Sequence, residues 1–417
     1  MVERLVIRGG RRLTGTAKIS GAKNAALPIL AATLLAEGKS ILHRVPNLRD
    51  IRMMQEILCD IGVHAVRVGS SLTVDTGTVT STVVGEQLSR EMRASVFLMG
   101  ALLARCGEVT VAYPGGCAIG PRPIDLHLKA FEKMGAHITE EHGTVRLTAK
   151  KLVGAEVQFD FPSVGATENA ILAGVLADGV TVLRNVAREP EVVDLASFLQ
   201  AMGAQIEGAG TDTITIRGVR RLFSAEYTIQ PDRIEAGTFL LAGCITRGEV
   251  VLEDVVPEHL FAVIDKLREA GAEVRCTQRE ISLRADRIRS VDIKTLPYPA
   301  FPTDLQAPMM ALMATAEGTG IITETIFENR FKQVDEFVRM GAHIRVEGRS
   351  AVVRGVPVLT GTKVEAGDLR AGAALVLAGL SAEGITEVER AVYIDRGYED
   401  IENKLRQLNA DIIRKKG

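Results

Sequence analysis

Hydrophobic and polar positions follow one another along this chain in a pattern that repeats about every 70 residues. Each repeat starts with an apolar run of small residues that ends at a glycine, as in residues 166–179, and a run of this length predicts a buried helix. A short β-rich segment follows (180–183), then a loop and a helix with apolar residues at helical spacing (192–202). Two strands joined by a glycine turn close the repeat, as in 342–346 and 351–354.

A short phrase, Met-Gly-Ala followed by a polar residue and Ile, marks the end of the second helix of a repeat. The phrase or a variant of it occurs at residues 134–138, 202–206, 270–274 and 340–344, with weaker copies at 61–65 and 408–412. Its glycine predicts the stop of that helix, because glycine readily adopts the left-handed conformation. The copies indicate six helix-strand-helix-strand-strand units. One such unit cannot cover both of its helices, so the units must pack in groups.

The last unit lacks its second closing strand, because the chain ends soon after the first one. Residues 4–9 have the character of the missing strand, so we expect the N-terminal strand to complete the sixth unit. This predicts an α/β fold of two lobes with three units each. Residues 21–230 would form the N-terminal lobe, which carries Cys117, and residues 1–20 plus 231–417 would form the C-terminal lobe. A cleft between two lobes is a favoured ligand site.

The composition narrows the class of protein. A net charge of −2 provides no general basic surface for nucleic acid. The apolar run at residues 25–35 is too short to span a bilayer. Five cysteines without framework or zinc spacing are typical of a reducing compartment. We therefore expect a soluble cytoplasmic protein without nucleic-acid or membrane partners.

Polar residues gather in two classes of loop, one before each helix of a unit. Helix N-termini attract anions through free amides and the helix dipole. Acidic and hydroxyl members such as Asp232, Glu189 and Thr303 are explained equally well as ordinary N-caps. Cations at these places oppose the dipole, so they predict a bound anion. These cations are Lys23, Arg93, Arg122, Arg330, Arg370 and Arg396. They indicate a substrate with several negative groups.

The loop at residues 114–123 is the longest of its class and the only one with a cysteine, Cys117. Its glycines let the backbone approach a ligand closely, and a nearby cation such as Arg122 favours the thiolate form of a cysteine. The alternative is a turn that buries a small apolar side chain. The place of this loop in the repeat pattern favours a thiol that takes part in chemistry.

Six segments together resemble the UDP-N-acetylglucosamine enolpyruvyl transferases of the EPSP synthase superfamily. They are residues 19–28, 114–120, 122–127, 301–304, 327–330 and 394–399. The resemblance extends over essentially the whole chain. It implies two lobes built as inside-out α/β barrels. It also implies transfer of the enolpyruvyl group of phosphoenolpyruvate to the 3-hydroxyl of UDP-N-acetylglucosamine, with release of phosphate. That reaction is the first committed step of peptidoglycan precursor synthesis, and the family needs no metal or organic cofactor.

The resemblance further implies roles for individual residues. The catalytic residues would be Cys117 as acid or nucleophile, Asp304 at the sugar hydroxyl, Lys23 and Arg396. The phosphoenolpyruvate site would consist of Lys23, Asn24, Arg122, Arg330, Arg370 and Arg396. The UDP-N-acetylglucosamine site would consist of Arg93, Arg122, Pro123, Ile124, Asp125, Leu126, Phe161, Pro162, Ser163, Val164, Asp304 and Ile326. Arg49, Glu189 and Asp232 are further candidates.

Three alternatives stay open. The sister enzyme that transfers enolpyruvyl to shikimate 3-phosphate shares the repeats, but it does not use the cysteine loop. A catalytically silent relative would only bind the UDP-sugar, and the presence of Lys23, Cys117 and Asp304 argues against it. An RNA-end-processing enzyme built on related repeats is disfavoured by the nearly neutral charge and by the lack of a candidate catalytic histidine in the matching loops.

Overall fold

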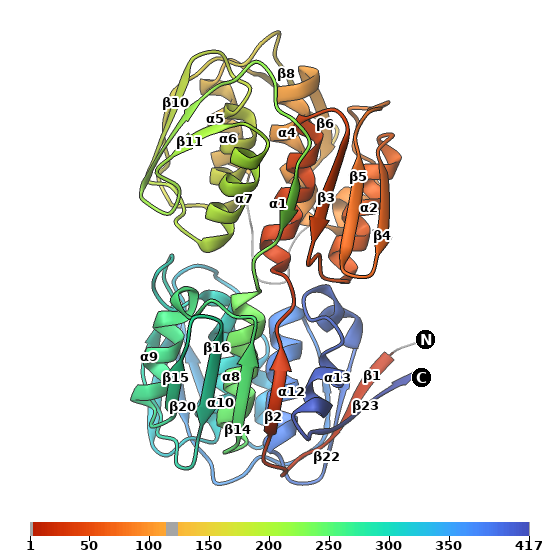
Figure 1. Ribbon diagram of the computed structural model, residues 1–417. Helices are drawn as coiled ribbons and strands as arrows, with labels where there is room; N and C mark the ends of the chain where they lie inside the picture. Colours follow the sequence, from red (N-terminus) through yellow and green to blue (C-terminus); the bar gives the residue numbers. More distant parts are fainter. Residues whose placement is uncertain (1–2, 114–123, 417) are drawn as a thin grey trace. The chain divides into compact units, whose positions relative to one another are not determined.

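The computed structural model describes residues 3–113 and 124–416, which form two compact units (Figure 1). The N-terminal unit comprises residues 21–113 and 124–230, and the C-terminal unit comprises residues 3–20 and 231–416. The chain passes between the units at Ser20–Gly21 and again at Gln230–Pro231. The loop with Cys117, Arg122 and Pro123 lies outside the described residues.

Three helices of small apolar residues form the centre of the C-terminal unit, where α10 packs against α8 and α12 and these two also touch. They are α8 (Arg233–Ile245), α10 (Gln306–Ala314) and α12 (Leu369–Ser381). The second helix of each repeat is amphipathic or short and lies further out. These helices are α9 (Phe261–Glu269), α11 (Val334–Arg339) and α13 (Ile401–Gln407). Nearly every residue of α8, α10 and α12 is buried, as expected for helices with no polar face.

Three four-stranded sheets belong to this unit, and in each the strands are ordered as follows. One sheet is β21 (Lys363–Glu365), β22 (Ile385–Glu389), β1 (Glu3–Arg8) and β23 (Asp411–Lys416). The next is β15 (Glu273–Cys276), β16 (Glu280–Arg284), β14 (Glu249–Glu253) and β2 (Thr14–Lys18). The third is β17 (Ile293–Lys294), β18 (Thr319–Thr323), β20 (Ser350–Arg354) and β19 (His343–Glu347). The N-terminal strand β1 lies antiparallel between β22 and β23, with Leu5 opposite both Val388 and Arg414.

The N-terminal unit has the same plan. Its central helices are α1 (Lys23–Ala32), α4 (Phe97–Cys106) and α6 (Val164–Gly174), and the others are α2 (Arg49–Asp60), α3 (Glu86–Glu91), α5 (Asp125–Lys133) and α7 (Pro190–Ala201). One sheet is β13 (Glu226–Thr228), β3 (Lys39–His43), β5 (Ser71–Asp75) and β4 (His64–Val68). Another is β11 (Gln205–Glu207), β12 (Thr213–Arg217), β10 (Val180–Arg184) and β9 (Glu156–Gln158). The third is β6 (Glu108–Ala112), β8 (Thr144–Thr148) and β7 (His137–Glu141).

Short 3-10 turns lead into or out of several helices. They are η1 (Thr33–Leu35), η2 (Arg93–Val96), η3 (Pro257–Leu260), η4 (Thr303–Leu305) and η5 (Ala391–Arg396). Three of the central helices begin at a side-chain N-cap: Ser163 caps α6, Asp232 caps α8 and Asp368 caps α12. Asp232 is an N-cap, since its carboxylate accepts the amides of Ile234 and Glu235.

The sheets contain a short parallel strand that the sequence pattern did not predict. This strand precedes the first helix of a repeat, and β9, β17 and β21 pair with β10, β18 and β22 in this way. At the two points where the chain changes unit, the short strand pairs with a strand of the unit that it leaves, not with the strand that follows the next helix. Strand β2 precedes α1 but pairs with β14, whereas β13 precedes α8 but pairs with β3.

Several central helices end before the glycine at which the pattern predicted their end. Helix α6 ends at Gly174 rather than at Gly179, and α10 ends at Ala314 rather than at Gly318. The residues in between form parallel bridges to the preceding segment, with Asp178 opposite Val153 and Glu317 opposite Arg289. Those backbone pairings replace the last helical turn. Helix α4 does end as predicted, at Gly107 with φ 78°.

Glycine is required where two backbones meet. A Cβ atom on Gly100 in α4 would lie 2.5 Å from the carbonyl oxygen of Asn169 in α6, so these central helices touch through main chain. A Cβ atom on Gly218, after β12, would lie 1.6 Å from the carbonyl oxygen of Ala177. Among the residues that the structure describes, no helix is long and apolar enough to cross a membrane.

Candidate active site

Asp304 lies between two buried arginines in the C-terminal unit. Its Oδ1 accepts a hydrogen bond from Arg330 Nη2 at 3.0 Å, and its Oδ2 accepts one from Arg370 Nη2 at 3.0 Å. The arginine side chains are only 5% and 6% exposed, whereas that of Asp304 is 27% exposed. Two positive charges thus share one carboxylate in a site with little water, where charge-assisted hydrogen bonds are strong.

Local structure explains how these three side chains come together. Asp304 belongs to η4, which leads into α10, and Arg370 is in the first turn of α12. Asp368 caps α12 by accepting the amide of Arg370 at 2.8 Å. Because α10 and α12 pack side by side, their N-terminal turns bring Asp304 and Arg370 together.

Arg370 also contacts Tyr398. Its Cζ lies 5.4 Å from the centre of the Tyr398 ring, a cation-π distance. The Tyr398 hydroxyl is 2.9 Å from the hydroxyl of Thr238 in α8, and Tyr398 is fully buried. Burial alone would lower the pKa of Arg370, but the Asp304 carboxylate outweighs it and raises that pKa above its usual value. Arg370 is therefore a permanent cation.

Arg396 is the last residue of η5 in the same unit. The neighbouring Asp395 accepts two hydrogen bonds from Arg414, at 2.7 and 3.0 Å, and Arg414 also binds Glu402 at 2.6 Å. These ion pairs attach η5 to strand β23. Ile326, a predicted sugar contact, also lies in this unit and donates its amide to Glu324.

In the N-terminal unit, Lys23 forms an ion pair with Asp50 at 2.8 Å. Lys23 is the first residue of α1 and Asp50 is the second residue of α2, and both are buried. The neighbouring candidates Asn24 in α1 and Arg49 in α2 occupy the same helix starts. Asp50 is not among the predicted site residues, because no local pattern in the sequence pairs it with Lys23.

These ion pairs change one step of the sequence argument. The sequence predicts a bound anion at the helix N-termini, because cations there oppose the dipole. In the structure, Lys23, Arg330 and Arg370 each have a carboxylate partner, and that partner offsets the unfavourable interaction with the helix dipole. An anionic ligand at these cations would share them with, or displace, a protein carboxylate.

The predicted UDP-sugar residues of the N-terminal unit lie at neighbouring helix starts. Asp125 and Leu126 begin α5, and Ser163 and Val164 begin α6. A Cβ atom on Gly165 would lie 3.2 Å from the ring of His127, so the two helix starts are adjacent. The remaining members of the set are Ile124, which precedes α5, Arg93 in η2, and Phe161 and Pro162, which precede α6. Phe161 is 43% exposed, which is high for an aromatic residue and leaves its ring accessible to a ligand.

His127 is a buried residue at this place that the sequence analysis did not single out. Its Nδ1 lies 2.9 Å from the side-chain nitrogen of Asn169, which also donates to the carbonyl oxygen of Val96. Asn169 in turn accepts the amide of Gly100. This polar network joins η2, α4, α5 and α6.

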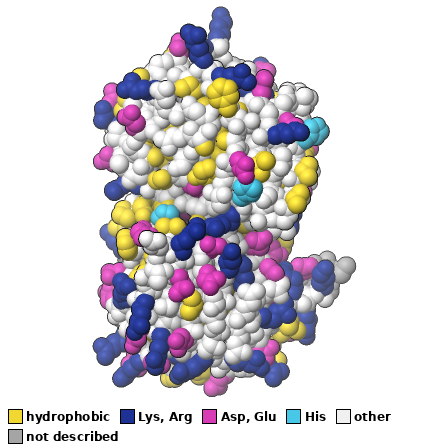
Figure 2. Space-filling model, in the orientation of Figure 1, with side chains coloured by type: hydrophobic (Ala, Val, Ile, Leu, Met, Phe, Trp, Pro, Cys, Tyr) yellow, Lys and Arg dark blue, Asp and Glu magenta, His cyan; other side chains and the backbone are white. Residues whose placement is uncertain are grey.

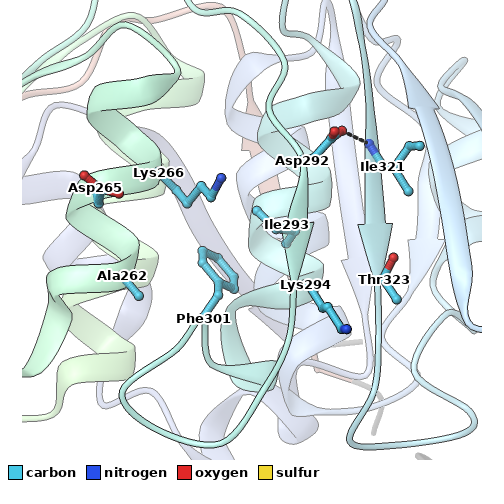
Figure 3. A pocket seen from close by; sticks show the side chains of 9 residues that line it. All are labelled: Ala262, Asp265, Lys266, Asp292, Ile293, Lys294, Phe301, Ile321 and Thr323. Carbon is cyan, nitrogen blue, oxygen red and sulfur yellow. Dashed lines mark hydrogen bonds between the residues drawn. The ribbon is translucent and has the colours of Figure 1, made fainter.

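A cavity of about 480 Å³ occurs elsewhere in the C-terminal unit, between α9 and the strands β17 and β18 (Figure 3). Phe301, Lys266 and Lys294 are among its lining residues. It contains none of the predicted site residues. On the face of the molecule in Figure 2, Lys and Arg side chains are interspersed with Asp and Glu, and neither sign dominates.

Each of the two units has three central helices, and the C-terminal unit places one carboxylate between two arginines. The chain belongs to the EPSP synthase (3-phosphoshikimate 1-carboxyvinyltransferase) family, whose model matches residues 7–405. It is 54% identical over 419 residues to UDP-N-acetylglucosamine 1-carboxyvinyltransferase 1 of Symbiobacterium thermophilum, and the aligned region covers 99% of this chain and 95% of that protein. It is 55% identical over 416 residues to UDP-N-acetylglucosamine 1-carboxyvinyltransferase 2 of Carboxydothermus hydrogenoformans, with 99% of each chain covered.

Solved structures agree with this assignment of the fold. The enolpyruvyl transferase NikO from Streptomyces tendae superposes with a TM-score of 0.89 at 27% identity, covering 100% of this chain and 99% of that one. EPSP synthase from Acinetobacter baumannii has a TM-score of 0.77 at 19% identity, with 100% of both chains covered, and so supports the fold alone. The predicted family and the predicted α/β fold class are confirmed.

Proposed function

We propose that this protein transfers the enolpyruvyl group of phosphoenolpyruvate to the 3-hydroxyl of UDP-N-acetylglucosamine and releases phosphate. The observation that carries the proposal is identity of 52–55% over nearly the whole chain to proteins named for 1-carboxyvinyl transfer to this sugar nucleotide. The product is the first committed precursor of peptidoglycan, and we assign the protein to the cytoplasm, where both small-molecule substrates are made.

The reaction needs one proton donor and one proton acceptor. In the addition step the sugar oxygen attacks C2 of the enol, loses its proton, and C3 gains one to become a methyl group. In the elimination step C3 loses a proton and phosphate leaves. Asp304 is a partly exposed carboxylate and can orient or deprotonate the sugar hydroxyl. Cys117 is the proposed proton donor, and its thiolate can also attack C2 to form a covalent adduct.

Arg330 and Arg370 are proposed to bind the phosphoenolpyruvate carboxylate, for which planar guanidinium groups are suited. Both bind Asp304 through Nη2. A carboxylate ligand that engages the two arginines would weaken their hold on Asp304 and so make Asp304 a stronger proton acceptor. Lys23, Asn24, Arg122 and Arg396 complete the proposed phosphoenolpyruvate site. Arg93, the 122–126 segment, the 161–164 segment and Ile326 complete the proposed sugar site.

The proton-donor role of Cys117 implies a change in its pKa during the reaction. Arg122 favours the thiolate, but an acid must carry its proton. Bound phosphate and carboxylate would cancel the positive charge and raise the thiol pKa. The rate of Cys117 alkylation measured against pH, with and without substrates, tests this idea. An apparent pKa that does not change on substrate binding would contradict it.

One assay separates the proposed function from its alternatives. Release of inorganic phosphate from phosphoenolpyruvate should require UDP-N-acetylglucosamine and should be blocked by fosfomycin. Release that requires shikimate 3-phosphate instead would identify the sister activity. Calorimetric binding of UDP-N-acetylglucosamine without any phosphate release would identify a silent relative. Cys117→Ser should lose turnover while still binding the sugar nucleotide.

A further inference from the structure

Beyond the residues proposed to touch substrate, we infer that Glu324 is a positioning residue that holds Asp304 and Arg330 in register. The inference rests on the proposed function for its catalytic consequence and on the structure for its geometry. Glu324 directly follows strand β18 and is 1% exposed. No sequence motif drew attention to it, because its partners are distant along the chain or are main-chain groups.

Both carboxylate oxygens of Glu324 have partners. Oε1 accepts the backbone amides of Ile326 at 2.8 Å and Phe327 at 3.2 Å, and Oε2 accepts the hydroxyl of Thr303 at 2.8 Å. The backbone of Glu324 is itself fixed, since its amide donates to the carbonyl oxygen of Arg349 at 2.8 Å. The side chain therefore joins two loops to the end of a sheet strand.

These are the two loops that carry the charged residues. Thr303 directly precedes Asp304 in η4, and the 326–327 segment leads directly to Arg330. Arg330 closes the connection from the other side, because its Nη2 contacts both the carbonyl oxygen of Thr303 at 3.4 Å and Asp304 Oδ1 at 3.0 Å. If Glu324 lost its carboxylate, the hydrogen bond between Thr303 and Glu324 would be gone. Of the contacts described, those of the Arg330 guanidinium would still join the two loops.

Comparison of the repeats within this chain shows that the position is specialised. In four repeats, the residue after the equivalent strand has a left-handed backbone: Arg44, Asn185, Asp254 and Arg390, with φ between 53° and 56°. In the part of the chain that the structure describes, only Tyr113 and Glu324 at this position lack a positive φ. Tyr113 precedes the loop with Cys117, and Glu324 precedes the loop with Arg330. The left-handed turn is thus absent at the two positions that directly precede the loops with Cys117 and Arg330.

The proposed mechanism requires the two loops to keep a fixed distance from each other. Asp304 must meet the sugar hydroxyl while Arg330 binds the phosphoenolpyruvate carboxylate, so the distance between the two loops decides whether the reactants are aligned. A displacement of about 1 Å costs roughly 100-fold in rate. A carboxylate that accepts from both loops at once fixes that distance better than side chains on either loop alone.

The test uses Glu324→Ala and Glu324→Gln, with Glu336→Gln as the matched control. Glu336 lies in α11 of the same repeat and also accepts a backbone amide, that of Glu365 at 3.1 Å, but it contacts neither loop. We expect Glu324→Ala to lower kcat/KM for phosphoenolpyruvate by about 10- to 100-fold. Glu324→Gln should recover part of this loss, because its amide oxygen still accepts the two backbone amides. Glu336→Gln should match the wild type.

Two readouts separate positioning from a merely structural role and from failure of the proposed function. If Glu324→Ala lowers the unfolding temperature but leaves kcat/KM unchanged, the positioning role is wrong. Hydrogen exchange provides the second readout, because it needs no activity. Amides of 326–330 and of 303–305 should both exchange faster in Glu324→Ala than in the wild type, and unchanged exchange would overturn the inference. If the wild type releases no phosphate, but Glu324→Ala still exchanges these amides faster than the wild type, the proposed function is refuted and the loop connection stands.

Discussion

Replacement of Asp304 by asparagine removes the negative charge that binds both buried guanidinium groups. The variant keeps the shape of the side chain, and its amide oxygen still accepts from one arginine. Its NH₂ group, however, points a donor at the other arginine. Arg330 and Arg370 then remain as two adjacent positive charges with side chains only 5% and 6% exposed.

The size of the effect follows from this burial. Removal of one partner from a buried ion pair costs about 3–5 kcal/mol. Asp304 itself is 27% exposed, so water compensates part of the loss, and we expect the Asp304→Asn variant to be less stable by about 2–3 kcal/mol. Turnover should fall by about 100-fold or more if Asp304 is the general base.

Guanidinium chloride unfolding, with and without sulfate, checks the charge argument. Sulfate should stabilise Asp304→Asn more than the wild type, because an anion that binds the two arginines stabilises only the folded state. Asp286→Asn is the control, since that carboxylate is 58% exposed and its loss should change the unfolding free energy by less than about 0.5 kcal/mol. If Asp304→Asn unfolds at the wild-type denaturant concentration, and if sulfate stabilises both proteins equally, the argument is refuted.

Three further predictions concern groups in the N-terminal unit. Burial, together with Glu191 and Glu189, raises the pKa of Glu168 well above its usual value. Between the pKa of the unfolded state and that of the folded state, the folded protein keeps a proton that the unfolded chain has released. The free energy of unfolding therefore falls as pH rises through this range, by up to about 1.4 kcal/mol per pH unit. Glu168→Gln should flatten this slope in urea unfolding between pH 5 and 8, and an unchanged slope would count against it. Lys23→Met should cost about 3 kcal/mol by leaving Asp50 buried without its cation, and Asp50→Asn added to it should restore part of the loss in a double-mutant cycle; strict additivity would disprove the coupling. Gly218→Ala should cost at least about 1–3 kcal/mol in thermal unfolding, because its Cβ would lie 1.6 Å from a carbonyl oxygen; a wild-type midpoint would show that the backbone yields freely.

The sequence alone determined the local elements and their order. Apolar runs of small residues predicted the central helices, and glycines predicted where helix α4 and the second helices end. Such features depend on neighbours within a few residues, so they can be seen in the pattern itself. The family could also be predicted, because its motifs are long contiguous segments of sequence.

The tertiary structure decided which polar groups meet. Asp304 binds Arg330 and Arg370, which are 26 and 66 residues away. The packing of α10 against α12 brings Asp304 and Arg370 together, and the loop after β18 brings Arg330 to them. The pairing of Lys23 with Asp50 and the three bonds of Glu324 are likewise invisible in any local pattern. The pairing of β2 with β14 and of β13 with β3 was likewise decided by the tertiary structure. The sequence of a strand indicates that it pairs with another strand, but not with which one.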